Sequence, residues 1–288
     1  MFKKSVAVLL IASVAVLFII RDKDARKEAD PIIAEARAAF VMEAETGKIL
    51  YQSNSGNAYP IASMSKLMTQ YLVLKAIKDG EISWDSEYRP SENAMNQSKY
   101  AVTLGMDPQQ TYTVRELFEA MTVVSANDAA IALSEVVSGS EKAFVKRMNE
   151  QAKKFGLQNT HFVNSTGLDE EKTNMATARD VAAIARSLIE EYPEVIDYTR
   201  MTDVTTRDGV RLWSTNHMLP GMPDEMDGMD GLKTGYTEAA ESCFASTGVF
   251  NGKRIITVVI GVEAEGGDTN TPRFALTRKL IDHYVLNQ

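Results

Sequence analysis

Strand patterns lie at both ends of the globular part of this chain, and helix patterns fill the residues between them. Near the start, two apolar runs flank a turn that ends at Gly47, which is typical of a β-hairpin. Near the end, two longer runs flank Asn251 and Gly252, a strong two-residue hairpin signal. The four runs are residues 40–42, 48–51, 242–250 and 254–262. We therefore expect a mixed α/β (α+β) fold with an antiparallel sheet assembled from both chain ends.

Helix start signals mark the middle of the chain. Thr113 and Glu116 form a capping-box pattern ahead of a run of periodic apolar residues. Residues 140–155 are amphipathic, and residues 177–180 open another apolar-periodic run. Pro272 stands at the start of a terminal helix. These signals predict helices that pack on the sheet, together with an inserted all-helical lobe.

Composition excludes several classes of protein. Of the 288 residues, 44% are apolar and 24% are charged, which argues against a disordered chain or a multi-span membrane protein. Cys243 is the only cysteine, so no internal disulfide can form, and we expect it to be a core residue. The histidines His161, His217 and His283 are far apart in the sequence. No metal-ligand cluster is predicted, and we expect neither a zinc hydrolase nor any cofactor.

The first residues form an export or anchoring signal. Residues 5–20 are uncharged and strongly apolar, and the charged block 21–28 follows them. A cleavable signal would need small residues directly after the apolar run, where this charged block stands, so an uncleaved membrane anchor is favoured over a signal peptide. More basic residues follow the apolar run than precede it, however, which the positive-inside rule does not favour for an exported C-terminus.

The whole chain divides into three predicted parts. We expect residues 1–28 to be the signal or anchor, 29–37 a linker and 38–288 one catalytic domain, with no C-terminal accessory domain. Beyond residue 28 there are 25 basic and 36 acidic side chains, a formal charge of −11. Nucleic acid is therefore a poor partner for this surface.

The first chemical motif is Ser63-x-x-Lys66. Apolar residues follow it at helical spacing, so Ser63 is predicted to start a buried helix with Lys66 one turn further on. A lysine amine can remove the serine proton if burial or a second cation lowers its pKa, and Lys233 is a candidate for that cation. A helix cap followed by a solvated lysine is the alternative interpretation of this motif alone.

Two further motifs follow in order. Ser125-x-Asn127 interrupts two helical runs, and polar residues at such a break can point into a cleft or simply cap a helix. The sequence Lys233-Thr234-Gly235 follows a turn-rich segment. Its glycine lets another backbone approach, while lysine and threonine can hold a carboxylate beside a strand edge; an ordinary strand start is the alternative.

Together these motifs resemble those of the penicillin-recognising serine enzymes. More closely, the chain resembles the D-alanyl-D-alanine carboxypeptidases of the low-molecular-weight penicillin-binding proteins, the S11 peptidase type. The resemblance covers about residues 35–288 and implies the β-lactamase/DD-peptidase fold. It is carried by the stretches 46–50, 62–69, 164–168, 177–180 and 230–237.

The resemblance also implies residue roles. Ser63 would be the acylated nucleophile, Lys66 its base, and Ser125 the relay of a proton to the departing amine. The backbone N–H groups of Ser63 and Tyr236 would form the oxyanion hole. The implied substrate-binding residues are Asn127 for an amide, Lys233 and Thr234 for the terminal carboxylate, Gly235 and Tyr236 on the same strand, and Arg273 for the carboxylate. Glu241 departs from the family, which often has glycine before the cysteine.

The implied activity is cofactor-free removal of the terminal D-Ala from peptidoglycan stem peptides through an acyl-enzyme, outside the cytoplasm. β-Lactams would form covalent adducts with the same serine. Three alternatives remain: a D,D-endopeptidase that cuts crosslinks, a class A-like β-lactamase, and a catalytically silent wall-binding protein. Glu170 and Asn174 have the spacing that a β-lactamase needs, but the stretches around them favour the peptidase.

Overall fold

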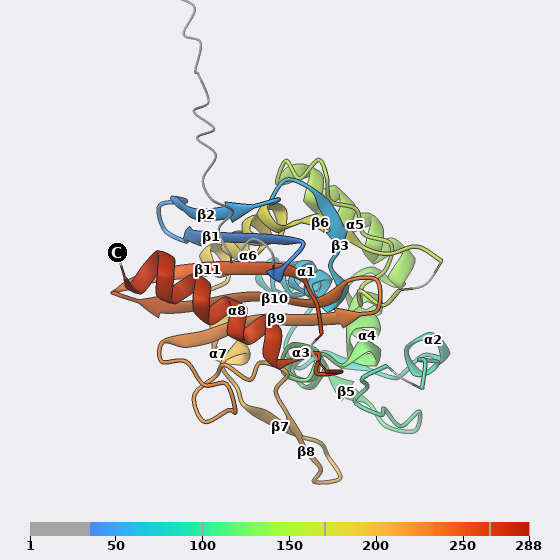
Figure 1. Cartoon of the computed structure of the whole chain (residues 1–288). Helices are drawn as coiled ribbons and strands as arrows, with labels where there is room; N and C mark the ends of the chain where they lie inside the picture. Colours follow the sequence, from blue (N-terminus) through green and yellow to red (C-terminus); the bar gives the residue numbers. More distant parts are fainter. Residues whose placement is uncertain (1–34, 100, 170, 265, 288) are drawn as a thin grey trace, which may run out of the picture. The chain divides into compact units, whose positions relative to one another are not determined.

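The computed structural model describes residues 35–99, 101–169, 171–264 and 266–287 (Figure 1). The strands are β1 (Ala38–Glu43), β2 (Ile49–Ser53), β3 (Ala58–Pro60), β4 (Glu87–Tyr88), β5 (Tyr112–Thr113), β6 (Met175–Thr177), β7 (Asp203–Thr205), β8 (Arg211–Trp213), β9 (Met229–Thr237), β10 (Glu241–Phe250) and β11 (Lys253–Val262). The α-helices are α1 (Lys66–Lys78), α2 (Glu92–Met95), α3 (Val114–Val123), α4 (Asn127–Ser138), α5 (Glu141–Lys154), α6 (Ala178–Glu191), α7 (Val195–Thr199) and α8 (Thr271–Ile281). A 3-10 turn, η2 (Ala62–Ser65), precedes α1, and a π-helical turn, η3 (Asp282–Leu286), follows α8.

The main sheet joins the two ends of the described chain. Its strand order is β2-β1-β11-β10-β9, and every neighbouring pair is antiparallel (Figure 1). Asn251 and Gly252 connect β10 to β11 with φ angles of 50° and 74°, which are the two positive values that a type I′ turn requires. Both predicted hairpins and the predicted sheet are therefore confirmed.

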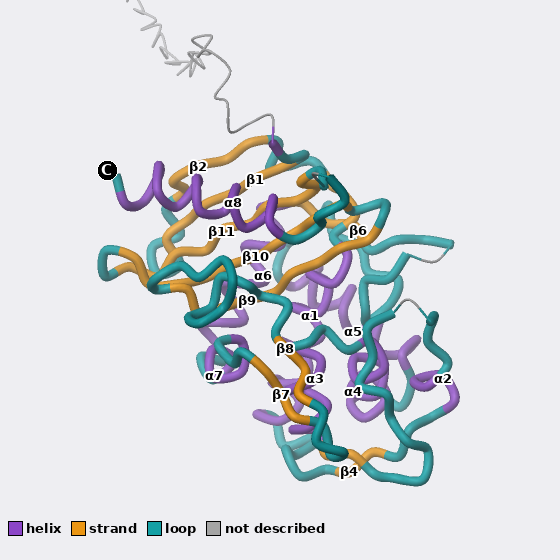
Figure 2. The backbone as a smooth tube through the Cα atoms, turned by 60° about the horizontal axis from the view of Figure 1, so that its bottom comes forward, coloured by secondary structure: helices purple, strands orange, loops and turns teal. Residues whose placement is uncertain are grey.

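The sheet is covered by helices on both faces. Alternate strand residues belong to different apolar clusters: Phe40 and Val258 pack toward α1 and α6, whereas Val41 and Val259 pack with Phe274 of α8. Figures 1 and 2 show α8 lying across one face of the sheet and α6 behind the other. The central strands are buried on both sides, which explains their nearly continuous apolar sequences.

A mostly helical lobe is inserted between β3 and β9, with α2, α3, α4 and α5 gathered to one side of the sheet (Figure 2). The capping box is confirmed: Thr113 Oγ1 accepts from Glu116 N, and the Glu116 side chain accepts from Thr113 N. The expectation that the lobe is all-helical is wrong. Strands β4 and β5 pair with each other at the two ends of the segment that connects them, and β7 pairs with β8.

The apolar segment 5–20, and the whole of the predicted signal or anchor at 1–28, lie outside the described residues. Within the part of the chain that the structure describes, no helix combines the length and the apolar character needed to cross a membrane. Cys243 lies on β10 and is completely buried, as expected for a core residue.

Candidate active site

Ser63 lies in the tight turn η2, immediately before the buried helix α1. Ala62 has a φ of 45°, which is unusual for a residue with a side chain. The Ser65 hydroxyl donates to the Ala62 carbonyl over 2.8 Å and so closes the turn on itself. The predicted position of Ser63 at a helix start is confirmed, with one 3-10 turn before the α-helix proper.

Two glycines from different segments, Gly167 and Gly235, lie close to the backbone of this turn. A Cβ atom on Gly167 would lie 2.0 Å from the Ala62 carbonyl oxygen, and one on Gly235 would lie 3.1 Å from the Ser63 nitrogen. A side chain at Gly167 would collide with this backbone, and one at Gly235 would require a shift of a few tenths of an ångström. The strand β9 and the loop before β6 therefore hold the backbone around Ser63 between them.

Lys66 is fully buried and its amine has three neighbours. Its Nζ lies 3.0 Å from Ser63 Oγ, 2.7 Å from Asn127 Oδ1 and 2.7 Å from the Thr166 carbonyl oxygen. Burial lowers the pKa of Lys66 well below its usual value, and the charge of Lys233 lowers it further, while Asp128 acts in the opposite direction.

These contacts fix the direction of the lysine lone pair. The amide oxygen of Asn127 and the carbonyl of Thr166 can only accept hydrogen bonds, so they take the two N–H groups of a neutral amine. The lone pair then faces Ser63, whose hydroxyl can donate to it. This is the arrangement that removal of a serine proton needs.

Ser125 and Asn127 lie at the break between α3 and α4, as predicted. Ser125 is buried and adopts a φ of 67°, a left-handed conformation that costs energy for a residue with a side chain. Besides accepting from Lys66, Asn127 donates from Nδ2 to the Val102 carbonyl over 3.0 Å. Asn127 thus ties the lysine to the loop that runs past the site.

Lys233 is a buried cation, with only 1% of its surface exposed. Its Nζ donates to the Thr234 carbonyl over 3.0 Å, and no carboxylate of the described residues lies within ion-pair distance of it. Burial, followed by the charge of Arg273, lowers the pKa of Lys233 to about 7. A buried cation without an anion is a natural place for a carboxylate to bind.

The neighbours of Lys233 lie along β9, the edge strand of the sheet. Thr234 Oγ1 donates to Thr215 Oγ1 over 2.7 Å, which links the strand to the segment after β8. Tyr236 is 45% exposed. As an edge strand, β9 has backbone groups that no further strand of the sheet pairs with, so an extended peptide can lie beside it.

Arg273 is placed differently from a surface charge in the first turn of a helix. It is 3% exposed, and its Nη1 donates to the Gly235 carbonyl over 2.7 Å and to the Cys243 carbonyl over 3.2 Å. Its Nη2 donates to Asn270 Oδ1. Burial lowers the pKa of Arg273 to about 10. The guanidinium therefore holds the backbone of β9 and adds positive charge behind Lys233.

A family model described as D-alanyl-D-alanine carboxypeptidase matches residues 24–264. The chain belongs to this S11 peptidase family. The carboxypeptidase DacF of Bacillus subtilis is 35% identical over 260 residues, which are 89% of this chain and 64% of DacF. This S11 chain thus spans less than two thirds of that relative.

Solved structures agree with this S11 assignment. The peptidoglycan synthesis regulatory factor PBP3 of Streptococcus pneumoniae superposes with a TM-score of 0.82 and 38% identity, over 87% of this chain and 71% of PBP3. Penicillin-binding protein D2 of Listeria monocytogenes, in its cefotaxime-bound form, gives a TM-score of 0.76 and 40% identity, over 86% and 96%. The predicted family and fold are confirmed.

Two residues that support the candidate site were not predicted from the sequence. Asp128 accepts hydrogen bonds from the backbone of Leu104 and Gly105, and its position directly after Asn127 at a helix start was an available signal. Glu141 Oε1 accepts from Ser165 N over 2.9 Å and from Ser165 Oγ over 2.6 Å, and so holds the loop that carries Thr166. No sequence pattern indicated Glu141.

Of the two residues that suggested a β-lactamase, the structure describes only Asn174. Glu170 lies outside the described residues. Asn174 is buried, and its Oδ1 accepts from Val163 N over 2.6 Å and from Asn164 N over 3.2 Å. Its side chain therefore supports the loop before Thr166 from within, where it is occupied with backbone groups.

Glu241, the expected departure from the family pattern, has a φ of 57°, a left-handed conformation that glycine adopts at lower cost. Its carboxylate pairs with Arg37 Nη2 at 2.7 Å, and Arg37 Nη1 donates to the Ala239 carbonyl over 2.8 Å. The turn between β9 and β10 is thus tied to the segment before β1 in this S11 chain.

Proposed function

We propose that this protein is a serine-type D-alanyl-D-alanine carboxypeptidase that trims peptidoglycan stem peptides. The observation that carries the proposal is the position of Lys66, whose buried amine lies 3.0 Å from Ser63 Oγ with both of its other partners restricted to accepting. Lys233, buried without a carboxylate partner among the described residues, supplies the charge that a C-terminal substrate needs.

Acylation starts at Ser63. Its Oγ attacks the carbonyl carbon of the penultimate D-Ala, and its proton passes to the neutral amine of Lys66. The carbonyl oxygen becomes an oxyanion, which the backbone N–H groups of Ser63 and Tyr236 stabilise. The close approach of Gly235 to the Ser63 nitrogen brings the two backbones together for this purpose.

Breakdown of the tetrahedral intermediate releases the terminal D-Ala. The carbon–nitrogen bond breaks, and the departing amine takes a proton that Ser125 relays. The ester at Ser63 is then hydrolysed by water, which yields the shortened peptide and restores the serine hydroxyl. The proton taken up by Lys66 in acylation is the one that ultimately balances the leaving amine.

Substrate binding follows from charge and from the strand edge. Lys233 and Thr234 bind the terminal carboxylate, Asn127 lies beside an amide of the peptide, and Arg273 keeps β9 in place while adding to the positive field. The peptide extends along β9. Because stem peptides lie outside the cytoplasm, we propose an extracytoplasmic location for residues 38–288, with residues 1–28 as the membrane anchor or export signal.

The direct test is release of D-Ala from a soluble pentapeptide by the purified chain, measured beside a crosslinked dimer. Wild type should release D-Ala and should form a slowly hydrolysed adduct with penicillin. Ser63→Ala should abolish both, whereas Ser53→Ala on β2, the opposite edge of the sheet, should change neither. Failure to release D-Ala would revive a silent wall-binding protein.

The same reagents separate the other candidates. A β-lactamase would turn over benzylpenicillin rapidly and repeatedly, which does not fit the occupied side chain of Asn174. A D,D-endopeptidase would split the crosslinked dimer faster than the pentapeptide. Penicillin labelling that survives Ser63→Ala would contradict the assigned nucleophile.

A further inference from the structure

A cavity of about 380 Å³ adjoins the candidate active site. Val124 lines this cavity and directly precedes Ser125, while Thr215 lines it and is hydrogen-bonded to Thr234. The other lining residues are Val102, Thr103, Arg211, Leu212 and Trp213. None of the nine predicted site residues lines this cavity, but two of them adjoin its lining: Ser125 through the chain and Thr234 through a hydrogen bond.

Both walls of this cavity are fastened to the catalytic motifs. On one side, the Val102 carbonyl accepts hydrogen bonds from Asn127 N at 2.8 Å and Asn127 Nδ2 at 3.0 Å. On the other side, Thr215 donates from its backbone nitrogen to the Val123 carbonyl over 3.2 Å. The spacing between the walls is thus set by the same contacts that arrange the site.

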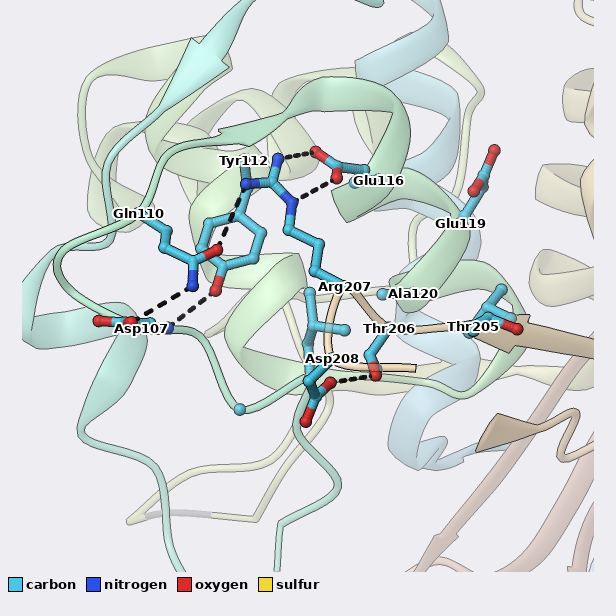
Figure 3. Close-up of a pocket in the computed structure, with 13 residues that line it drawn as sticks. Asp107, Gln110, Tyr112, Glu116, Glu119, Ala120, Thr205, Thr206, Arg207 and Asp208 are labelled. Carbon is cyan, nitrogen blue, oxygen red and sulfur yellow. Dashed lines mark hydrogen bonds and ion pairs between the residues drawn. The ribbon is translucent and has the colours of Figure 1, made fainter. Parts of the chain in front are cut away.

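The hairpin β7–β8, which carries Trp213, is also held from its far end. Arg207 lies in the turn of this hairpin and contacts Glu116 of α3 at 2.7 and 2.8 Å (Figure 3). Its guanidinium lies 4.9 Å from the centre of the Tyr112 ring. Arg207, Glu116 and Tyr112 line a second cavity, of about 300 Å³. The wall formed by Trp213 is therefore preorganised.

The cavity lining is apolar, and part of it is open to solvent. Trp213 is 55% exposed and Val102 is 49% exposed, which leaves both available to a ligand. Arg211 lies 4.0 Å from the centre of the Trp213 ring, but its charge is compensated by Asp203 at 2.7 Å. The surface therefore favours methylene groups over charged ones.

We propose that this cavity is a subsite for the side chain of the leaving amino acid, and that it accepts a long aliphatic side chain where D-Ala has a methyl group. The inference rests on the proposed function. In the leaving residue, one carbon bears the amine, the carboxylate and the side chain. With the first two at Ser125 and Thr234, the side chain is directed to the space that their neighbours Val124 and Thr215 line. A bulkier leaving group, such as the residue released from a crosslink, then fits.

The test compares two peptides with the same acyl part, one ending in D-Ala-D-Ala and the other in D-Ala-D-norleucine. Wild type should hydrolyse them with kcat/KM values within about tenfold of each other. Trp213→Ala should lower the ratio of norleucine to alanine kcat/KM about tenfold, since three methylene groups lose a contact surface. Val210→Ala, at an exposed residue of the same hairpin that does not line the cavity, should leave the ratio unchanged.

A second variant fills the cavity instead of enlarging it. Val102→Trp should exclude the norleucine side chain and lower the same ratio, with no loss of the fold because Val102 is half-exposed. The proposal is overturned if wild type discriminates more than about a hundredfold against norleucine. It is also overturned if Trp213→Ala lowers kcat/KM equally for both peptides.

Fluorescence supplies a readout without catalysis. The chain has two tryptophans, Trp84 and Trp213, so Trp84→Phe in a Ser63→Ala background leaves Trp213 as the sole indole. The norleucine peptide should shift Trp213 emission more than the alanine peptide. Equal shifts overturn the subsite even if neither peptide is hydrolysed, whereas absent D-Ala release and absent penicillin labelling of wild type contradict the proposed function itself.

Discussion

Gly235 lies so close to the nucleophile turn that a Cβ atom there would come within 3.1 Å of the Ser63 nitrogen and 3.0 Å of the Ile61 carbonyl oxygen. The strand proposed to bind substrate and the turn that carries Ser63, the proposed nucleophile, therefore approach each other through backbone atoms. Their separation is fixed by the absence of a side chain.

Gly235→Ala should push these two backbones apart by a few tenths of an ångström. We expect kcat/KM for D-Ala release to fall by about 10²-fold, because oxyanion donors act only when correctly placed. Thermal unfolding should shift little. Gly252→Ala, in the β10–β11 turn where no atom lies near the added Cβ, serves as a control that affects stability but not acylation. Unchanged acylation of Gly235→Ala would contradict the assigned oxyanion hole.

Lys66→Arg tests whether the base must be neutral. Arginine keeps a buried positive charge but does not lose its proton in proteins, so it cannot accept one from Ser63. Penicillin acylation should slow by about 10³-fold, as expected for loss of a general base. Labelling with benzylpenicillin measures this rate, and near-normal labelling would show that Lys66 acts only through its charge.

Lys233 should make stability depend on pH. Its pKa is about 7 in the folded protein and 10.5 as the reference value, so between these values the unfolded chain binds the extra proton. Stability should therefore rise with pH from about 7 to 10.5, at no more than ~1.4 kcal/mol per pH unit from this group. Urea midpoints at pH 7 and 9 measure the slope.

Lys233→Met should remove this contribution and reduce the slope, while the buried Lys66 amine keeps its own contribution. The variant should also be more stable than wild type at pH 7, because an unpaired buried cation is lost, while D-Ala release falls. Lys142→Met, at an exposed position of α5, should leave both the slope and the activity unchanged. An identical slope in Lys233→Met would show that the lysine is not a buried titrating group.

Glu141 offers a test of indirect positioning. Both of its hydrogen bonds to Ser165 are accepted by Oε1, so Glu141→Gln retains them and should keep most activity. Glu141→Ala releases the loop that places the Thr166 carbonyl against Lys66, and acylation should fall about tenfold. A shift in the pH dependence of acylation should accompany this loss. Equal behaviour of the two variants would argue against the positioning role.

Local signals predicted much of this fold. The Asn251–Gly252 turn, the Thr113–Glu116 capping box and the Ser63–Lys66 spacing each depend on a few neighbouring residues, and each is present as expected. The strands β4 and β5 were not predicted, because two residues carry no period that a pattern can detect. The lobe was therefore expected to be more helical than it is.

Contacts between distant segments account for what the sequence left open. The Thr166 carbonyl is a partner of Lys66, yet any residue supplies a backbone carbonyl, so no side-chain motif indicates it. Arg273 begins a helix, where charges are commonly exposed, and only the packing of α8 on the sheet reveals that it is buried. The hydrogen bond between Thr215 and Thr234 likewise depends on tertiary structure, so the sequence does not indicate it.

The pairing of β1 with β11 has a consequence for synthesis of the protein. Strand β1 can pair with β11 only after residues 253–262 have been synthesised. This inner pair of strands in the sheet is therefore absent while most of the chain is made. Such non-local pairing is slow because closing a long loop costs entropy before the strands form favourable contacts. The strand that presses Gly235 against Ser63 enters the same late assembly. A nascent chain should therefore complete the backbone arrangement around Ser63 in one of the last steps of folding.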